Sequence, residues 1–223
     1  ISLSKKLIDG KEKVDINRIG NSLYMDVLSL NFQISNIISV AEIEAGTLEK
    51  EISSIDFDGM LSEIKDALQY LISDKNIDLK IDIQKSGNAI YQDRAKLYSI
   101  LINLLSNAIN FSPKNAAVEL YIKEQENDIK IIVKDYGEGI SKDNEKVIFE
   151  RFRQAHTGLN RTHMGQGLGM GIIRDFIEFL DGEFNLESKE NSFTTFEFTL
   201  PKESADESLF KDDDLLFDDV AEF

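Results

Sequence analysis

The chain has 223 residues, no cysteine and a formal net charge of −16 at pH 7. This negative charge argues against nucleic acid or an anionic membrane surface as the main partner. The lack of cysteine excludes disulfide bonds and thiol catalysis and is compatible with a cytoplasmic location, which we expect. No apolar run reaches about 18 residues, so we expect no membrane contact by this segment.

The first 45 residues have helical periodicity. Apolar residues recur there at steps of three and four: Ile16, Ile19, Leu23, Val27, Leu30, Ile34, Ile37, Ile38 and Ala41. This pattern predicts one long amphipathic helix, which Gly46 ends. Its apolar seam could pack on its own domain or belong to a helical hairpin that dimerises, and the length and regularity of the seam favour the second interpretation.

The following elements alternate between helices and paired strands. Helices are predicted over 57–73, 94–110 and 168–180, and strands over 77–83, 117–124, 128–135, 183–188 and 193–200. The last four strands form two hairpins, and Pro201 stops the final one. We therefore expect a two-layer α/β sandwich with a mixed, mostly antiparallel sheet. The expected domains are a helical region (1–50), the sandwich (51–202) and an acidic tail (203–223).

Two stretches have no clear periodicity. The stretch from Ser141 to Met164 is long for a loop inside a compact domain, and loops of this length are commonly lids or disordered. The tail after Lys202 carries nine acidic residues and one lysine, and so holds half of the net charge. It is either a linker or an amphipathic segment that docks on a partner.

The helix over 94–110 carries three asparagines in the run LINLLSNAIN. Asn103 and Asn107 are four residues apart and share one helix face, and Asn110 follows three residues later. Asparagine is a mediocre helix former, so three of them in one helix require a reason. They form either a polar exposed stripe or a set of amide oxygens aimed at a hydrated cation such as Mg²⁺.

The stretch KDYGEGIS places Asp135 at the end of an apolar strand, followed by Gly137 and Gly139. A carboxylate at a strand end can accept hydrogen bonds from an exocyclic amine of a base. Glycines beside it allow the backbone to approach a flat ring. A simple turn would explain the same letters.

The run HMGQGLGMGI has glycine at alternate positions from 165 to 171 and opens a helix. Backbone N–H groups at the start of a helix suit an anion such as phosphate. The dinucleotide fingerprint fails because Met170 stands where its third glycine is required, and the P-loop fails because no lysine follows these glycines.

Taken together and in order, these motifs resemble the catalytic part of bacterial sensor histidine kinases, in the ATPase superfamily shared with gyrase, Hsp90 and MutL. LINLLSNAINFS resembles the N box, DYGEGI and GQGLGMG the two glycine boxes, VIFERF the F box, and FTTFEFTLP the closing strand. AEIEAGTLE resembles the end of the second dimerisation helix. The resemblance covers roughly residues 10 to 201 and implies a Bergerat-type ATP-binding fold.

The resemblance also implies ATP and Mg²⁺ as ligands. Asn107 would be the Mg²⁺ ligand, and Arg153 would contact the γ-phosphate. Asp135 would bind the adenine amine, and Thr195 would lie under the adenine beside it. Further nucleotide-binding positions would be Asn103, Asn110, Gly137, Gly139, Ile140, Phe149, Phe152, Gly165, Gly167, Leu168 and Gly169, with the two phenylalanines anchoring the lid.

One element of the family pattern is missing from the sequence. The family's phosphoacceptor histidine is followed by an acidic residue and, further on, by a proline. His156 and His163 fall in the lid segment and lack that context. The resemblance places the missing motif upstream of Ile1, so we expect this chain alone to bind ATP without autophosphorylating.

Two asparagines depart from related sequences. Asn103 stands where hydrolysing members of the superfamily carry the glutamate that activates water, and asparagine cannot take a proton near neutral pH. This favours transfer to a histidine over hydrolysis. Asn110 stands where many relatives carry lysine, so one cation near the phosphates is absent.

We therefore expect a histidine kinase catalytic domain that transfers the γ-phosphoryl group of Mg-ATP to a histidine, for relay to an aspartate of a receiver domain. The full-length protein is expected to form a homodimer. The alternative is a non-catalytic, nucleotide-sensing module whose ATP-ordered lid is read by a partner.

Overall fold

The structure is a computed structural model that describes residues 20, 27, 30, 34–35, 37–145, 147–149 and 169–204. Residues 37–45 are helical, and the helix ends at Gly46, whose φ is 64° and whose N–H donates to the carbonyl of Ile43. The predicted helix end is therefore confirmed. Most of the predicted helix before residue 37, the lid segment from 150 to 168 and the acidic tail from 205 lie outside the described residues.

Seven strands and four helices follow among the described residues. The helices are α3 (Phe57–Lys75), α4 (Arg94–Phe111), α5 (Lys142–Glu145) and α6 (Gly169–Phe179). The strands are β1 (Ile52–Ser54), β2 (Asp78–Gln84), β3 (Tyr91–Asp93), β4 (Ala117–Glu124), β5 (Asp128–Asp135), β6 (Glu183–Lys189) and β7 (Phe193–Pro201). The main sheet has the order β2-β4-β5-β7-β6, in which only the β2–β4 pair is parallel. The predicted mixed, mostly antiparallel sheet is confirmed.

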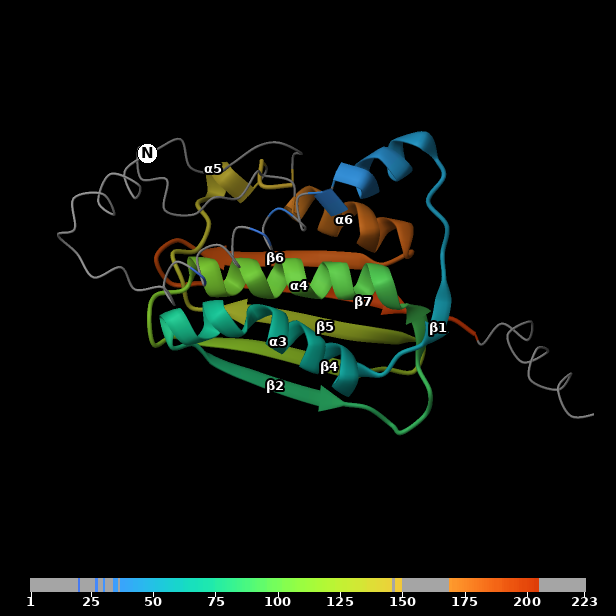
Figure 1. The fold of residues 1–223 in the computed structure, drawn as a ribbon, viewed down its shortest axis with the longest axis horizontal. Coiled ribbons are helices and arrows are strands. Elements are labelled where there is room, and N and C mark those ends of the chain that lie inside the picture. The colour runs from blue at the N-terminus through green and yellow to red at the C-terminus, as the bar shows by residue number, and fades with distance from the viewer. Residues whose placement is uncertain are drawn as a thin grey trace, which may run out of the picture.

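Helices α3, α4 and α6 lie side by side over one face of this sheet (Figure 1). The strands alternate accordingly: in β5, Ile129, Ile131 and Val133 are buried against the helices, whereas Lys130 and Ile132 lie on the other face. Helix α4 is central and contacts α3, α6 and the sheet. This two-layer arrangement places α4 directly above the end of β5, where the site is formed.

Both ends of α3 and the start of α4 have identifiable causes. The Asp56 side chain accepts a hydrogen bond from the Gly59 N–H and starts α3, and the left-handed residue Asn76 ends it. The Asp93 side chain accepts from the Lys96 N–H and starts α4. These caps fix where the two helices begin and therefore which α4 residues reach the sheet edge.

A second, two-stranded sheet pairs β1 with β3. It was not predicted, because strands of three residues are too short to show alternation. β3 leads directly into α4, so this small sheet anchors the N-terminal end of the helix that carries the asparagines.

Candidate functional site

Asp135 is the last residue of β5, and its side chain lies on the helix-covered face of the sheet with only 7% exposure. Its Oδ1 accepts a hydrogen bond from the Gly137 N–H at 2.9 Å. Its Oδ2 has no hydrogen-bond partner among the described residues. Burial raises the pKa of the Asp135 carboxyl to about 6, and the hydrogen bond from Gly137 lowers it by a smaller amount. Asp135 is thus a buried acceptor with one oxygen available to a ligand.

The loop after Asp135 is held between α4 and the β6–β7 hairpin. A Cβ atom on Gly137 would lie 2.2 Å from the carbonyl oxygen of Phe111, the last residue of α4. Gly139 has a φ of 64°, and a Cβ there would lie 2.2 Å from the carbonyl oxygen of Lys189. The Ile140 N–H donates to the Ser188 hydroxyl at 2.8 Å. Both glycines are therefore required by close backbone approach.

The three asparagines of α4 are half-buried, and the donor side of each amide is already occupied. Asn103 Nδ2 donates to the Ser99 carbonyl at 2.8 Å, Asn107 Nδ2 to the Met170 sulfur at 3.5 Å, and Asn110 Nδ2 to the Ser106 hydroxyl at 3.4 Å. Their Oδ1 atoms accept no hydrogen bond within the described part of the chain. An arrangement that fixes the amide nitrogens and leaves the oxygens available suits a hard cation, which prefers oxygen ligands.

Helix α6 begins against these asparagines. A Cβ on Gly169 would lie 3.2 Å from Asn103 Oδ1, and the next residue, Met170, contacts Asn107. The end of the glycine run therefore contacts α4, although these two segments are more than sixty residues apart in the sequence. This contact places the start of α6 beside the available amide oxygens.

The threonine on the face of Asp135 is Thr194, and not Thr195 as predicted. The strand register pairs Asp135 with Thr194 and Lys134 with Thr195. Directly paired residues share a face of the sheet, so Thr194 lies on the face of Asp135 and Thr195 lies on the other. The Thr194 hydroxyl is 3.1 Å from that of Ser188. Sequence analysis missed both hydroxyls, because only the register between β5 and β7 reveals which threonine faces the aspartate.

Phe149, from the predicted lid anchor, packs on the sheet. Its ring centroid lies 5.0 Å from that of Phe184 and 6.2 Å from that of Phe196. The other predicted site residues of this region fall outside the described residues: Phe152, Arg153, Gly165, Gly167 and Leu168, together with His156 and His163. Their predicted roles stay predictions.

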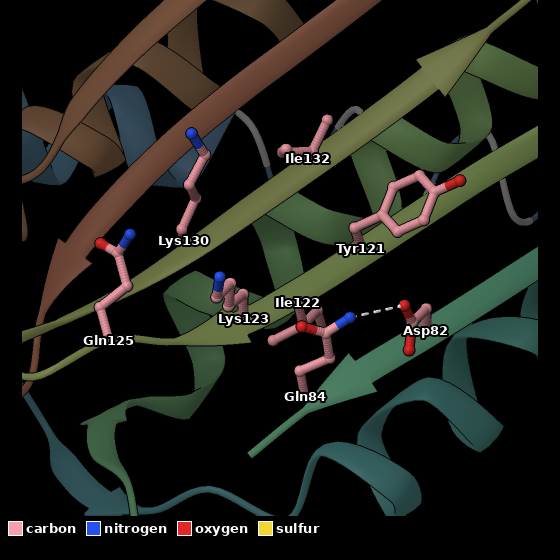
Figure 2. Close-up of a pocket in the computed structure, with 8 residues that line it drawn as sticks. All are labelled: Asp82, Gln84, Tyr121, Ile122, Lys123, Gln125, Lys130 and Ile132. Carbon is pink, nitrogen blue, oxygen red and sulfur yellow. Dashed lines mark hydrogen bonds between the residues drawn. The ribbon is translucent and has the colours of Figure 1, made fainter. Parts of the chain in front are cut away.

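A separate shallow pocket of about 300 Å³ lies on the opposite face of the sheet (Figure 2). Tyr121, Lys123, Lys130 and Ile132 project into it from β4 and β5, and the only interaction drawn there joins Gln84 to Asp82 on β2. It shares no residue with the Asp135 site and is separated from it by the sheet. The chemistry of Asp135 and the asparagines makes their side the candidate site.

No group of three or more His, Cys, Asp and Glu residues able to hold a metal ion occurs within the described ranges. Also within those ranges, no helix is long and apolar enough to cross a membrane.

Known proteins share both the sequence and the fold. The family model of the histidine kinase-, DNA gyrase B- and HSP90-like ATPases matches residues 92–204, half of the chain. The chain is 28% identical over 197 residues to the autoinducer 2 sensor kinase/phosphatase LuxQ of Vibrio parahaemolyticus, covering 86% of this chain and 22% of that protein. It is 29% identical over 187 residues to the aerobic respiration control sensor protein ArcB homolog of Haemophilus influenzae, covering 83% and 57%.

Among solved structures, the Acinetobacter baumannii histidine kinase AdeS matches with a TM-score of 0.66 and 20% identity, over 90% of this chain and 91% of that one. Full-length ShkA in complex with AMPPNP matches with a TM-score of 0.69 and 21% identity, over 87% and 40%. Identities this low show the shared fold alone. The chain spans about a fifth of the length of LuxQ. With the family model, the fold and these relatives in agreement, the chain belongs to the histidine kinase-, DNA gyrase B- and HSP90-like ATPases and is related to sensor histidine kinases.

Proposed function

We propose that this chain binds Mg-ATP between α4 and the Asp135 loop, and that it is the catalytic domain of a histidine kinase. The observations that carry the proposal are a buried carboxylate at the end of β5 and amide oxygens on α4 that accept no hydrogen bond from any described residue. Asp135 Oδ2 accepts from the adenine amine, and Thr194 lies beside it on the same face. Asn107 Oδ1, with Asn103 and Asn110 one turn to either side, faces the phosphates.

Mg²⁺ fits the chemistry of these residues, because it binds oxygen ligands and keeps several waters. Asn107 is the residue that would hold it, and the ion supplies charge neutralisation on the phosphates when bound. The chain itself contributes orientation: the fixed amide nitrogens aim the oxygens, and the buried end of β5 excludes water from the base. The AMPPNP complex of the similar kinase ShkA supports a nucleotide at a fold of this kind.

Within this proposal the γ-phosphoryl group passes to a histidine other than His156 or His163 and then to an aspartate of a receiver domain. Phosphoryl transfer depends mainly on positioning and charge stabilisation, which is what the site residues supply. Asn103 at the position of a water-activating glutamate favours transfer over hydrolysis. The chain functions in the cytoplasm, and the names of its relatives, sensor kinases and hybrid kinases, support a receiver as partner.

The proposal includes a homodimer of the full-length protein. Five apolar side chains on the N-terminal helix follow spacings of three and four residues, and each is between 47% and 55% exposed. They are Val27, Leu30, Ile34, Ile37 and Ile38. An apolar helical seam with this spacing is suited to pack against another helix. A second copy of the chain would bury it.

Calorimetry with Mg-ATP tests the site. We expect wild-type chain to bind, and Asp135→Asn and Asn107→Ala to bind at least about tenfold more weakly, since each removes a charge-assisted or metal interaction. Asn107→Ala should lose the Mg²⁺ dependence of binding, and Asp135→Asn should keep it. Unchanged affinity in both variants would rule out the site.

A labelling experiment separates a kinase from a purely nucleotide-sensing module. Incubation with γ-labelled ATP should give no acid-labile label on this chain alone. A longer form that carries a phosphoacceptor histidine should become labelled, and the Asn107→Ala substitution in it should abolish the label. ATP binding without any label in the longer form would favour the sensing module.

A further inference from the structure

Lys75, the last residue of α3, reaches the C-terminal end of the neighbouring helix α4. Its Nζ donates to the carbonyl oxygens of Ile109 at 3.1 Å, of Asn110, and of Ser112 at 2.9 Å. An ammonium group has three N–H donors, so all three are used here. The last carbonyls of a helix lack intrahelical partners and carry the negative end of its dipole. A lysine from another helix thus caps the helix that carries the asparagines.

The carbonyl of Phe111, which lies between Asn110 and Ser112 in the chain, supports the loop that follows Asp135. It accepts the Glu138 N–H at 3.3 Å, and it is the atom that would lie 2.2 Å from a Cβ on Gly137. The Gly137 N–H in turn donates to Asp135 Oδ1. An unbroken series of contacts therefore leads from Lys75 through the end of α4 to the carboxylate proposed to bind the base.

The electrostatic surroundings of Lys75 agree with this placement. The ammonium group is half-buried, and burial lowers its pKa, whereas the negative charge of Glu138 in the glycine loop raises it. A half-buried cation is costly unless its donors are satisfied, and here the partners are backbone carbonyls of α4. Lys75 accordingly draws two segments together, the end of α4 by hydrogen bonds and the loop by charge.

We propose that Lys75 is a positioning residue of the nucleotide site, holding the C-terminal end of α4 so that Phe111 supports the loop of Asp135. The inference rests on the proposed function, because it assigns the loop to base binding. Lys75 acts through the protein and does not touch the nucleotide. Its contribution is therefore the same for any nucleotide with the same base.

Affinities of the full chain for Mg-ATP and Mg-ADP test this role. Lys75→Met keeps the length of the side chain and removes the donors, so we expect binding of both nucleotides to weaken by the same factor, about tenfold. Lys75→Arg, which keeps charge and donors, should recover most of the loss. Lys65→Met, an exposed position on the same helix, is the matched control and should bind like wild type. A larger loss for ATP than for ADP would indicate a direct phosphate contact and would overturn the proposal, as would unchanged affinity.

Hydrogen exchange of the nucleotide-free chain gives a readout that does not depend on binding. In Lys75→Met the Glu138 amide should exchange faster, while the Ile131 amide in the centre of β5 should keep its protection and so report an intact fold. If Lys75→Met fails to fold, Lys75→Gln must show the same selective effect at Glu138. Unchanged exchange at Glu138 overturns the positioning role even if ATP binds, whereas a wild-type chain that binds no nucleotide overturns only the proposed function.

Discussion

Asp135 is more costly to the fold than an exposed aspartate, because its carboxyl is buried and its pKa is raised from 3.8 to about 6. A raised pKa means that the folded state favours the protonated form. The stability that protonation provides is fully present below pH 4 and is lost as the pH rises through 6. At pH 7 the ionised group therefore destabilises the fold by up to about 3 kcal/mol.

Asp135→Asn removes this charge and keeps an acceptor for the Gly137 N–H. We expect the variant to be more stable than wild type at pH 7.5, by up to about 3 kcal/mol, and to bind nucleotide more weakly. The gain should shrink at pH 5, where wild-type Asp135 is mostly protonated. Urea unfolding at the two pH values measures it, and a gain that does not depend on pH would contradict the assigned pKa shift.

Gly137 permits a close approach between the loop after β5 and the backbone of α4. Gly137→Ala places a methyl group 2.2 Å from the Phe111 carbonyl oxygen, so the loop must move away from α4. We expect a destabilisation of about 1–3 kcal/mol and a loss of nucleotide affinity. Gly20→Ala is the control, because no described atom lies within 4 Å of a Cβ there. Thermal unfolding and calorimetry of the two variants would test the difference, and equal behaviour would refute it.

Among single residues, the sequence identifies those that belong to a short motif of neighbouring residues. The spacing of Asn103 and Asn107 and the position of Asp135 between a strand and two glycines are local, and the structure has both asparagines half-buried on α4 and Asp135 buried at the end of β5. Thr194 and Ser188 could not be found in that way. Their position beside Asp135 depends on the register of β5 against β7, which is set by packing across the sheet.

At the scale of the elements, the start of α4 is held by a buried ion pair. The Asp93 side chain is fully buried and accepts from the Lys96 Nζ at 2.6 Å and from the Glu51 N–H at 2.9 Å. Lys96 Nζ also donates to the Glu49 carbonyl at 2.7 Å and lies 5.5 Å from the centroid of the Phe179 ring. One lysine thus joins the segment before β1, the start of α4 and the end of α6.

Lys96→Met leaves the buried Asp93 carboxylate without its cation. Because an unpaired buried charge is strongly unfavourable, we expect a destabilisation of about 3 kcal/mol, which Lys96→Arg should partly restore. The control is Lys85→Met, which breaks the exposed ion pair with Asp58 and should leave stability unchanged. Chemical denaturation compares the three variants, and equal stability of Lys96→Met and Lys85→Met would show that the buried pair has no special weight.

The regular elements were largely predictable, because their periodicity comes from burial on one face. The predicted helix over 94–110 and strand over 128–135 correspond to α4 and β5 within one residue. Pairings between distant segments were not predictable. The parallel pairing of β2 with β4 and the β1–β3 sheet join segments across intervening helices, and neither leaves a local pattern in the sequence.

At the scale of the molecule, the segment that precedes the α/β sandwich and the segment that follows it are in contact with each other. Lys50 Nζ lies 2.6 Å from an Asp181 carboxylate oxygen and 3.3 Å from one of Glu203. Gln92 Nε2 donates to the Pro201 carbonyl at 2.9 Å, and the Glu203 N–H donates to the Tyr91 carbonyl at 3.1 Å. The segments before β1 and after β7 are therefore tied to the strand that leads into α4.

This arrangement predicts how far the domain can be shortened. A fragment of residues 92–204, the range matched by the family model, lacks α3 and its buried side chains Phe57, Met60, Leu61, Ile64 and Leu68. At about 2 kcal/mol for each, that loss is roughly 10 kcal/mol, comparable with the whole stability of a typical domain. We expect this fragment to be unfolded, and a fragment of residues 37–204 to fold cooperatively.

A fragment of residues 51–202, the boundaries expected from the sequence, should fold with a lower melting temperature than 37–204. It lacks the Glu49 carbonyl that accepts from Lys96, and it lacks both Lys50 and Glu203. Lys96→Met should therefore reduce stability less in 51–202 than in 37–204, because the hydrogen bond from Lys96 to the Glu49 carbonyl is already absent from the shorter fragment. Thermal melts of the four proteins measure this coupling. If Lys96→Met lowers the melting temperature equally in the two fragments, the segment before β1 does not contribute to the stabilising contacts of Lys96.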